Sequence, residues 1–355
     1  MGVAEDGSCE AQRGFRTRRI PQVGKRHPSI DFLKASAIVT VIWIHSFLLL
    51  GQPRSGIRQL AFFSRFAVPA FFFTSGFLYF SATPISGQVL VERVKRVVFP
   101  YLVASGIVIA ARALALGTIT AKEVGIELLA GNAVGIYYFV PVLLAAMPLA
   151  ILLSRASWLT APLLLVLLPL GVLCELQYVV IDTSFGMDSL SWNVRNPLRW
   201  WGYFVGGWWM AGHVDEIRGL GRSARQWTGM IVFVVVASLF VYVVLELPPT
   251  WSRSRTGLEY VAIWGVIMGI FLLAFDWPEV RAVRWLSDAT YPIYLYHYFF
   301  IFLYRFVVVE PLRRRLLLAQ AILDGIAFLV GLAGSLAVVA FGRRAFGRRA
   351  RLRIG

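Results

Sequence analysis

An apolar stretch near the N-terminus carries three ionisable side chains. It reads "IDFLKASAIVTVIWIHSF" and holds Asp31, Lys34 and His45. On a helix, Lys34 and His45 lie about 20° apart around the axis and about 16 Å apart along it, and Asp31 falls on nearly the same face. A neutral imidazole can act as a general base toward a hydroxyl, and one buried at this depth needs a partner or a task. We group Asp31 and Lys34 with His45 as catalytic candidates, although both could instead mark the membrane interface.

Two other apolar stretches carry polar groups. "SRFAVPAFFFTSGFLYF" contains Arg65 and Ser75, and "YPIYLYHYFF" contains Tyr296 and His297. A buried guanidinium stays charged, so we expect an anionic or carbonyl partner for Arg65. The Tyr–His cluster either satisfies its own hydrogen bonds as part of the core or belongs to a site.

A basic stretch precedes another apolar run. In "ERVKRVVFPYL", Arg93 and Arg96 lie on one face, and Pro100 is expected to open the span. Planar guanidinium groups suit phosphate, which favours a site for a phosphate-bearing donor. The alternative is that these arginines only anchor the helix on the cytoplasmic side.

Composition indicates an integral membrane protein. Of 355 residues, 58% are hydrophobic and 15% are charged, whereas soluble domains carry about 25% charged residues. The net charge is +16, but the basic residues flank apolar runs and no soluble stretch could form a nucleic-acid module. We therefore expect the lipid bilayer, and not nucleic acid, as a partner. The two cysteines form no disulfide framework or metal motif, and we expect no metal.

The apolar runs predict an all-α, polytopic helical bundle. A span needs about 20 mostly apolar residues, and its backbone groups must be satisfied within a helix. About ten runs qualify: 30–51, 57–81, 99–118, 134–153, 157–176, 198–214, 227–247, 258–275, 289–309 and 319–342.

Basic residues predict that both termini are cytoplasmic. The arm at 1–28 and the tail at 343–355 each hold six Lys and Arg residues, and an even number of spans puts both ends on one side. The basic residues of loops 82–98 and 215–226 also fall on the predicted cytoplasmic side. By contrast, the loop "EPLRRRLLL" places three arginines on the opposite side of the membrane. The membrane domain between arm and tail is predicted at 29–342.

Six motifs in order resemble acyltransferase family 3, membrane proteins that O-acylate surface sugars, lipids and some secreted metabolites. They are "IDFLKASAIVTVIWIH", "RFAVPAFFFTSGFLYF", "RVKRVVFPY", "GIYYFVPVLL", "YFVGGWWMAG" and "LSDATYPIYLYHYF". The resemblance covers about residues 28–342. Lys34 stands where the family usually has Arg. A lysine ammonium cannot form the two parallel hydrogen bonds with which a guanidinium binds its partner.

The resemblance implies a membrane O-acyltransferase. The donor would be acetyl-CoA or another acyl-CoA on the cytoplasmic side, and the acceptor a hydroxyl of a cell-envelope or exported carbohydrate or glycolipid. It implies His45 as base, Arg93 and Arg96 near the donor phosphates and Lys34 along the acyl path. Arg65 and His297 match family positions that we assign to the acceptor side or the oxyanion. On physical grounds Ser75 and Tyr296 could also donate to the oxyanion. The implied location is the cytoplasmic (inner) membrane, with multiple spans.

Two other classes of protein fit the same residues. A transporter or flippase of a sugar or lipid intermediate would use the polar stripe of the first helix as a translocation path. A membrane scaffold would leave the buried His and Arg residues without a purpose.

Overall fold

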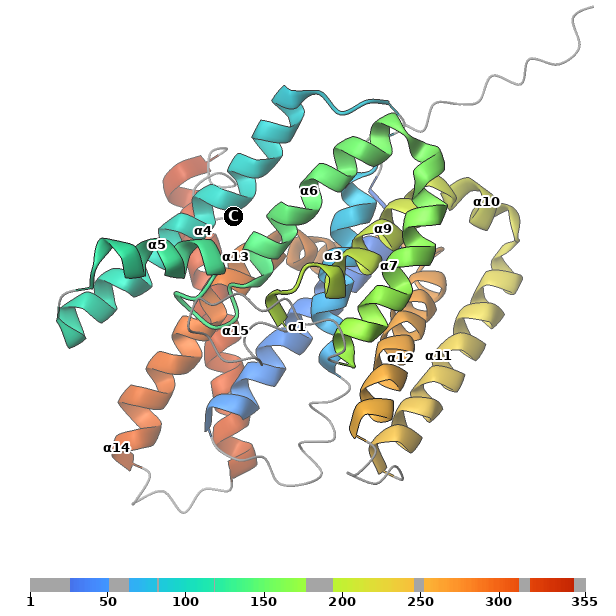
Figure 1. Ribbon diagram of the computed structural model, residues 1–355. Helices are drawn as coiled ribbons and strands as arrows, with labels where there is room; N and C mark the ends of the chain where they lie inside the picture. The colour runs from blue at the N-terminus through green and yellow to red at the C-terminus, as the bar shows by residue number, and fades with distance from the viewer. Residues whose placement is uncertain are drawn as a thin grey trace, which may run out of the picture.

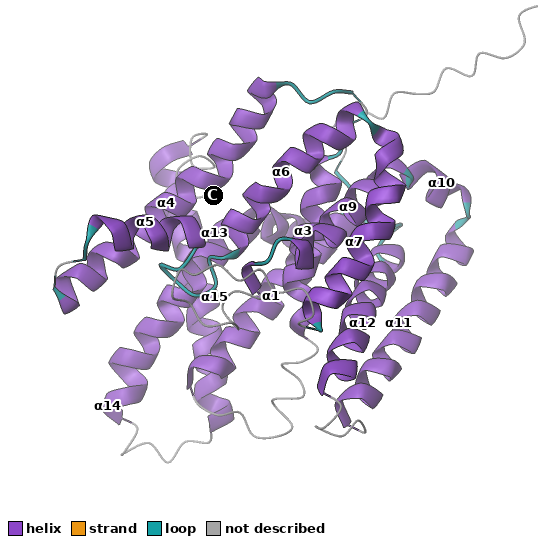
Figure 2. Ribbon diagram, in the orientation of Figure 1, coloured by secondary structure: helices purple, strands orange, loops and turns teal. Residues whose placement is uncertain are grey.

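The structure, a computed structural model, describes residues 26–50, 64–81, 83–117, 119–176, 194–245, 252–312 and 320–347. Within these ranges the regular elements are helices, and none is a strand (Figures 1 and 2). In chain order they are α1 (Pro28–Leu50), η1 (Ser64–Phe66), α3 (Ala67–Tyr79), α4 (Gly87–Leu116), α5 (Ala121–Ala130), α6 (Phe139–Arg155), η2 (Ser157–Leu159), α7 (Thr160–Glu175), α9 (Leu198–Gly212), α10 (Val214–Gly219), α11 (Arg222–Leu245), α12 (Ser252–Leu273), α13 (Arg281–Tyr304), η4 (Arg305–Val309), α14 (Glu310–Leu312) and α15 (Gln320–Phe346).

The predicted all-helical class is confirmed, and each of the ten predicted runs contains a helix. Within the described part of the chain, five helical stretches are long and apolar enough to cross a membrane. They are Pro28–Phe47, Gly87–Ala115, Ser157–Glu175, Thr290–Val309 and Ile322–Phe346. Phe139–Arg155 and Gly257–Leu273 are apolar but shorter. The total of ten spans, the cytoplasmic termini and the domain limits stay predictions. Most of the arm and of the tail lies outside the described residues.

The prediction that Pro100 opens a span was wrong. Helix α4 begins at Gly87, after Ser86, whose hydroxyl accepts a hydrogen bond from the backbone N–H of Val89. A capped start stabilises a helix well before the apolar run begins. The helix continues through Pro100 to Leu116, because a proline inside a helix removes only one backbone hydrogen bond and neighbouring elements can compensate for it. Arg93 therefore lies on a helix and not in a loop.

Helix α1 lies in the middle of the bundle (Figure 1) and contacts α3, α12, α13 and α15. Its neighbour α13 lies alongside it, so residues from the two ends of the chain meet. Five apolar residues of α1 are almost fully buried: Leu33, Ala37, Ile38, Val41 and Ile42.

Glycines bring α3 and α9 into backbone contact. A Cβ on Gly76 would lie 1.9 Å from the carbonyl oxygen of Phe204, and a Cβ on Gly207 would lie 1.9 Å from that of Phe73. Small residues at such a contact let two helices approach closely, which is how helices gain packing energy in a membrane. The close approach fixes α3, which carries Ser75, against α9.

Candidate active site

Two histidines meet between α1 and α13. His45 lies one turn before the end of α1, and His297 lies in the second half of α13. The distance between His45 Nδ1 and His297 Nε2 is 2.9 Å, a hydrogen bond. The His297 ring is fully buried, whereas His45 is partly exposed. The structure therefore joins the predicted base to a second predicted site residue.

The partners of His297 determine which nitrogens carry protons. Its Nδ1 lies 2.9 Å from the carbonyl oxygen of Ile293, which can only accept, so Nδ1 carries the hydrogen. In a neutral ring Nε2 is then an acceptor, and His45 Nδ1 must donate to it. The lone pair of His45 consequently stays on Nε2. A ring in this tautomer can take a proton at Nε2 while its other nitrogen is held in place.

Aromatic rings surround the histidine pair. The Tyr298 ring contacts His45 edge-on, with centroids 5.6 Å apart, and the Tyr294 ring lies 6.3 Å from that of His297. Within the described part of the chain, neither Ser75 nor Tyr296 forms a hydrogen bond to either histidine; both are partly exposed. Their role at the oxyanion stays a prediction.

Asp31 lies at the opposite end of α1, in an ionic network that we call the latch: Arg26, Asp31, Ser287 and Asp288. One carboxylate oxygen of Asp31 accepts from Arg26 Nε at 2.6 Å, and the other accepts from Ser287 Oγ at 2.6 Å. Arg26 also pairs with Asp288 at 3.0 Å. Because Asp31 lies fourteen residues from His45, the rise of a helix separates them by about 21 Å. The structure does not bring these two predicted catalytic residues together.

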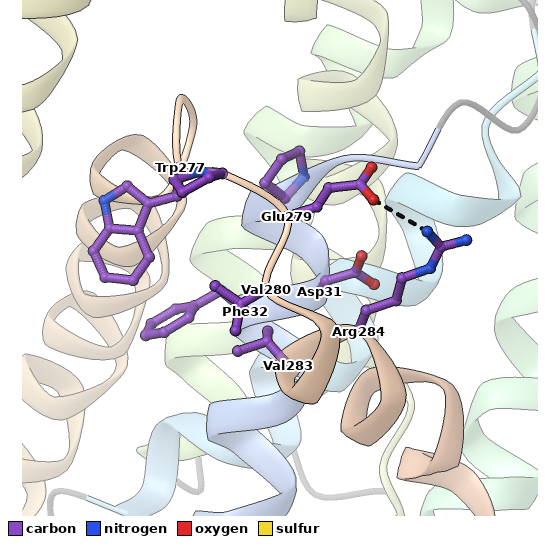
Figure 3. A pocket seen from close by; sticks show the side chains of 9 residues that line it. Asp31, Phe32, Trp277, Glu279, Val280, Val283 and Arg284 are labelled. Carbon is purple, nitrogen blue, oxygen red and sulfur yellow. Dashed lines mark hydrogen bonds and ion pairs between the residues drawn. The ribbon is translucent and has the colours of Figure 1, made fainter.

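A surface pocket opens beside the latch (Figure 3). Asp31 lies on its wall, and the Glu279–Arg284 ion pair, 3.1 Å long, closes one side. The lining residues are Pro28, Asp31, Phe32, Trp277, Pro278, Glu279, Val280, Val283 and Arg284. Lys34 is partly exposed, one turn further along α1.

A buried histidine adjoins the latch. His27 packs against the rings of Phe271 and Phe275, with centroids 5.6 and 4.6 Å away, and its Nδ1 has no partner among the described residues. Burial lowers the pKa of His27 to about 4. This ring is therefore neutral at pH 7 and contributes to the core.

Arg65 has an anionic partner, as the sequence predicts, but the prediction that it is buried within a span was wrong: its side chain is 51% exposed and it lies in η1, before α3. Its Nη1 lies 2.5 Å from an oxygen of Glu259, whose side chain is only 4% exposed. Arg65 belongs to η1, which contacts both α1 and α12. The Arg65–Glu259 ion pair therefore belongs to an element that packs against the helix carrying His45.

The two predicted donor-binding arginines lie on α4. Arg93 Nη1 donates to the carbonyl oxygen of Tyr79 at 3.0 Å, and the guanidinium carbon lies 4.7 Å from the centre of the Tyr79 ring. Arg93 thus caps the end of α3, while Arg96, one turn away, is exposed. The structure keeps the pair on one side of α4, as expected.

Sequence reasoning missed three partners in this region. Nothing in the sequence connects His45 to His297, or Arg65 to Glu259, because each pair is about 200 residues or more apart along the chain. Arg26 could have been found, since it stands five residues before Asp31, within reach of the first helical turn.

Comparison with known proteins shows the family of the chain. A family model described as an acyltransferase domain, that of acyltransferase family 3, matches residues 27–342. Comparison with curated proteins gave no match, and neither did comparison with solved structures. The matched segment holds the histidine pair, Arg65, the α4 arginines and the latch carboxylates. The chain belongs to acyltransferase family 3.

Proposed function

We propose that this membrane acyltransferase transfers an acyl group, most simply acetyl, from acyl-CoA to a hydroxyl of a cell-envelope or exported carbohydrate or glycolipid, with His45 as general base. The observation that carries the proposal is the His45–His297 hydrogen bond. It fixes the His45 ring and leaves Nε2 as the nitrogen that accepts a proton.

The transfer follows from that nitrogen. His45 Nε2 takes the proton of the acceptor hydroxyl while its oxygen attacks the thioester carbonyl carbon. The tetrahedral intermediate collapses, the C–S bond breaks and the thiolate leaving group takes the proton back from His45. The products are an ester and free CoA thiol. During the step His45 is an imidazolium, and the acceptor nitrogen of His297 stabilises it, as a third group orients the base in a catalytic triad.

The negative charge that develops on the thioester oxygen needs donors. Arg65, Ser75 and Tyr296 are the candidates, and removing one such donor typically costs about 3 kcal/mol of transition-state stabilisation. Arg65 lies two residues before the first residue of α3, and its ion pair with Glu259 orients the guanidinium.

The donor would enter from the cytoplasmic side of the inner membrane. Arg93 and Arg96 offer guanidinium groups to the CoA phosphates, and the described contact of Arg93 uses one of its five N–H donors. Lys34 lies on α1 between that side and His45, which suits a residue along the acyl path.

The test uses His45→Ala with His213→Ala as a matched control. His213 is a partly exposed histidine whose Nδ1 bonds to the carbonyl oxygen of Trp209 and whose Nε2 lies 3.9 Å from an oxygen of Glu216, far from the histidine pair in the sequence. In reconstituted vesicles supplied with acetyl-CoA and a surface-glycan extract, we expect acceptor-dependent release of CoA thiol from the wild type. His45→Ala should lose about 10²- to 10⁴-fold of that rate, and His213→Ala should retain it.

Mass spectrometry of the same extract identifies the product. An acetyl-sized mass increment on one glycan, absent with His45→Ala, supports the proposal and names the acceptor. Full activity of His45→Ala would contradict it. Movement of a sugar across the vesicle membrane without acyl-CoA would favour a transporter instead.

A further inference from the structure

Two tyrosines exchange hydrogen bonds between α13 and the loop that precedes α6. Tyr137 donates to the carbonyl oxygen of Leu295 at 2.5 Å, and Tyr294 donates to the carbonyl oxygen of Ile136. Tyr137 and Tyr294 are 2% and 3% exposed. We call these four residues the tyrosine clasp. A buried phenol that donates to a carbonyl ties two elements together at a defined place.

The loop side of the clasp is itself held firmly. Helix α5 ends at Ala130 and is capped by Gly131, whose φ of 67° favours glycine. A Cβ on Gly131 would lie 2.6 Å from the carbonyl oxygen of Tyr137. Arg112 donates to the carbonyl oxygen of Ala133 at 2.9 Å. Arg195 donates to the side-chain oxygen of Asn132 at 2.6 Å. Two guanidinium groups and a glycine turn therefore make this loop a rigid anchor.

Helix α13 needs an anchor at this point. Pro292 lies inside the helix and has no N–H to donate to the carbonyl of Asp288, four residues earlier. The helix is weakened there, and neighbouring elements must fix the two halves relative to each other. The clasp engages Tyr294 and Leu295, two and three residues after the proline and within one turn of His297.

We propose that Tyr137 and Tyr294 are positioning residues, which hold the second half of α13 so that His297 Nε2 receives the His45 Nδ1 hydrogen bond. This inference rests on the proposed function and deepens it. Among the described residues, each phenol bonds to a backbone carbonyl and neither bonds to His45 or His297. They act through His297, because a displacement of about 1 Å at a catalytic group can cost 10²-fold in rate.

The experiment compares Tyr137→Phe, Tyr294→Phe and the double variant with Tyr291→Phe. Tyr291 is the matched control, because it lies on the same helix, before Pro292, and its phenol donates to the carbonyl oxygen of Val97 at 2.6 Å. We expect the double clasp variant to lose about 10- to 100-fold in kcat with an unchanged KM for acetyl-CoA. Tyr291→Phe should retain the wild-type kcat.

A double-mutant cycle separates positioning from a merely structural role. If the clasp acts through His297, Tyr294→Phe costs nothing further in kcat when it is added to His297→Ala. An equal loss of kcat in the wild-type and His297→Ala backgrounds would contradict the positioning role of the clasp, and so would an unchanged kcat in the double clasp variant. Neither result would contradict the proposed function. A wild-type protein that releases no CoA in response to acceptor would overturn the proposed function, and the inference with it.

Discussion

The two ends of the α1–α13 pair use polar residues in opposite ways. At one end Asp31 accepts from Arg26 and Ser287, so both carboxylate oxygens are engaged. At the other end His45 bonds to His297 through one ring nitrogen, and the second nitrogen keeps its lone pair. Both residues lie on one helix and both were catalytic candidates by sequence.

The difference shows how to tell a structural polar group from a reactive one. A carboxylate whose oxygens are bonded to a guanidinium and a hydroxyl stabilises a helix contact and has little left for a substrate. A histidine with one nitrogen held and the other available is oriented for proton transfer. The latch therefore stabilises the contact between α1 and α13 at the end that lies away from the histidine pair.

Removing His297 should have the largest effect after loss of His45 itself. We expect His297→Ala to lower kcat about 100-fold, because His45 would lose the partner that fixes its tautomer and stabilises its charge. Steady-state kinetics with acetyl-CoA measure this, and the KM should stay unchanged. His297→Gln is the conservative variant: its side-chain oxygen can accept from His45 Nδ1, so it should recover part of the rate. Equal rates for Ala and wild type would contradict a catalytic pair.

Disrupting the latch should affect stability and not chemistry. Asp31→Asn keeps the shape of the side chain but removes the charge that pairs with Arg26. Hydrogen bonds to charged groups contribute about 1.5–3 kcal/mol each, so we expect a lower thermal midpoint in detergent. The kcat per folded molecule should be retained. A loss as deep as that of His45→Ala, at unchanged stability, would instead make Asp31 catalytic.

The sequence predicted the helices of this molecule better than their contacts. Hydrophobic runs of about 20 residues mark helices because lipid forces backbone groups to pair locally. The polar stripe of α1 was also predictable, since helical spacing fixes which side chains share a face. The start of α4 was missed because the Ser86 cap lies outside the apolar run. The pairing of His45 with His297 was missed because helical spacing says nothing about which helices become neighbours.

A smaller effect should follow from loss of one hydroxyl in the latch. Ser287→Ala removes the hydrogen bond to Asp31 Oδ1, and we expect a cost of about 1.5 kcal/mol in unfolding free energy. Thr290→Val is the matched control, because the Thr290 hydroxyl donates within α13, to the carbonyl oxygen of Leu286. In an Asp31→Asn background the Ser287 substitution should cost less. A Ser287 effect that is the same in both backgrounds would contradict coupling within the latch.

The smallest effect concerns His27 and its pH dependence. The pKa of His27 is about 4 in the folded protein and 6.5 when the ring is exposed. Between pH 4 and pH 6.5 the unfolded state therefore binds more protons at His27 than the folded state does. Stability is therefore complete above pH 6.5 and falls as the pH drops toward 4, with a loss of about 1 kcal/mol between pH 7.5 and 6. His27→Phe keeps an aromatic ring among the phenylalanines but cannot titrate, so its thermal midpoint should fall less over that range. A slope for His27→Phe equal to that of the wild type would show that another group causes the acid sensitivity of the latch end.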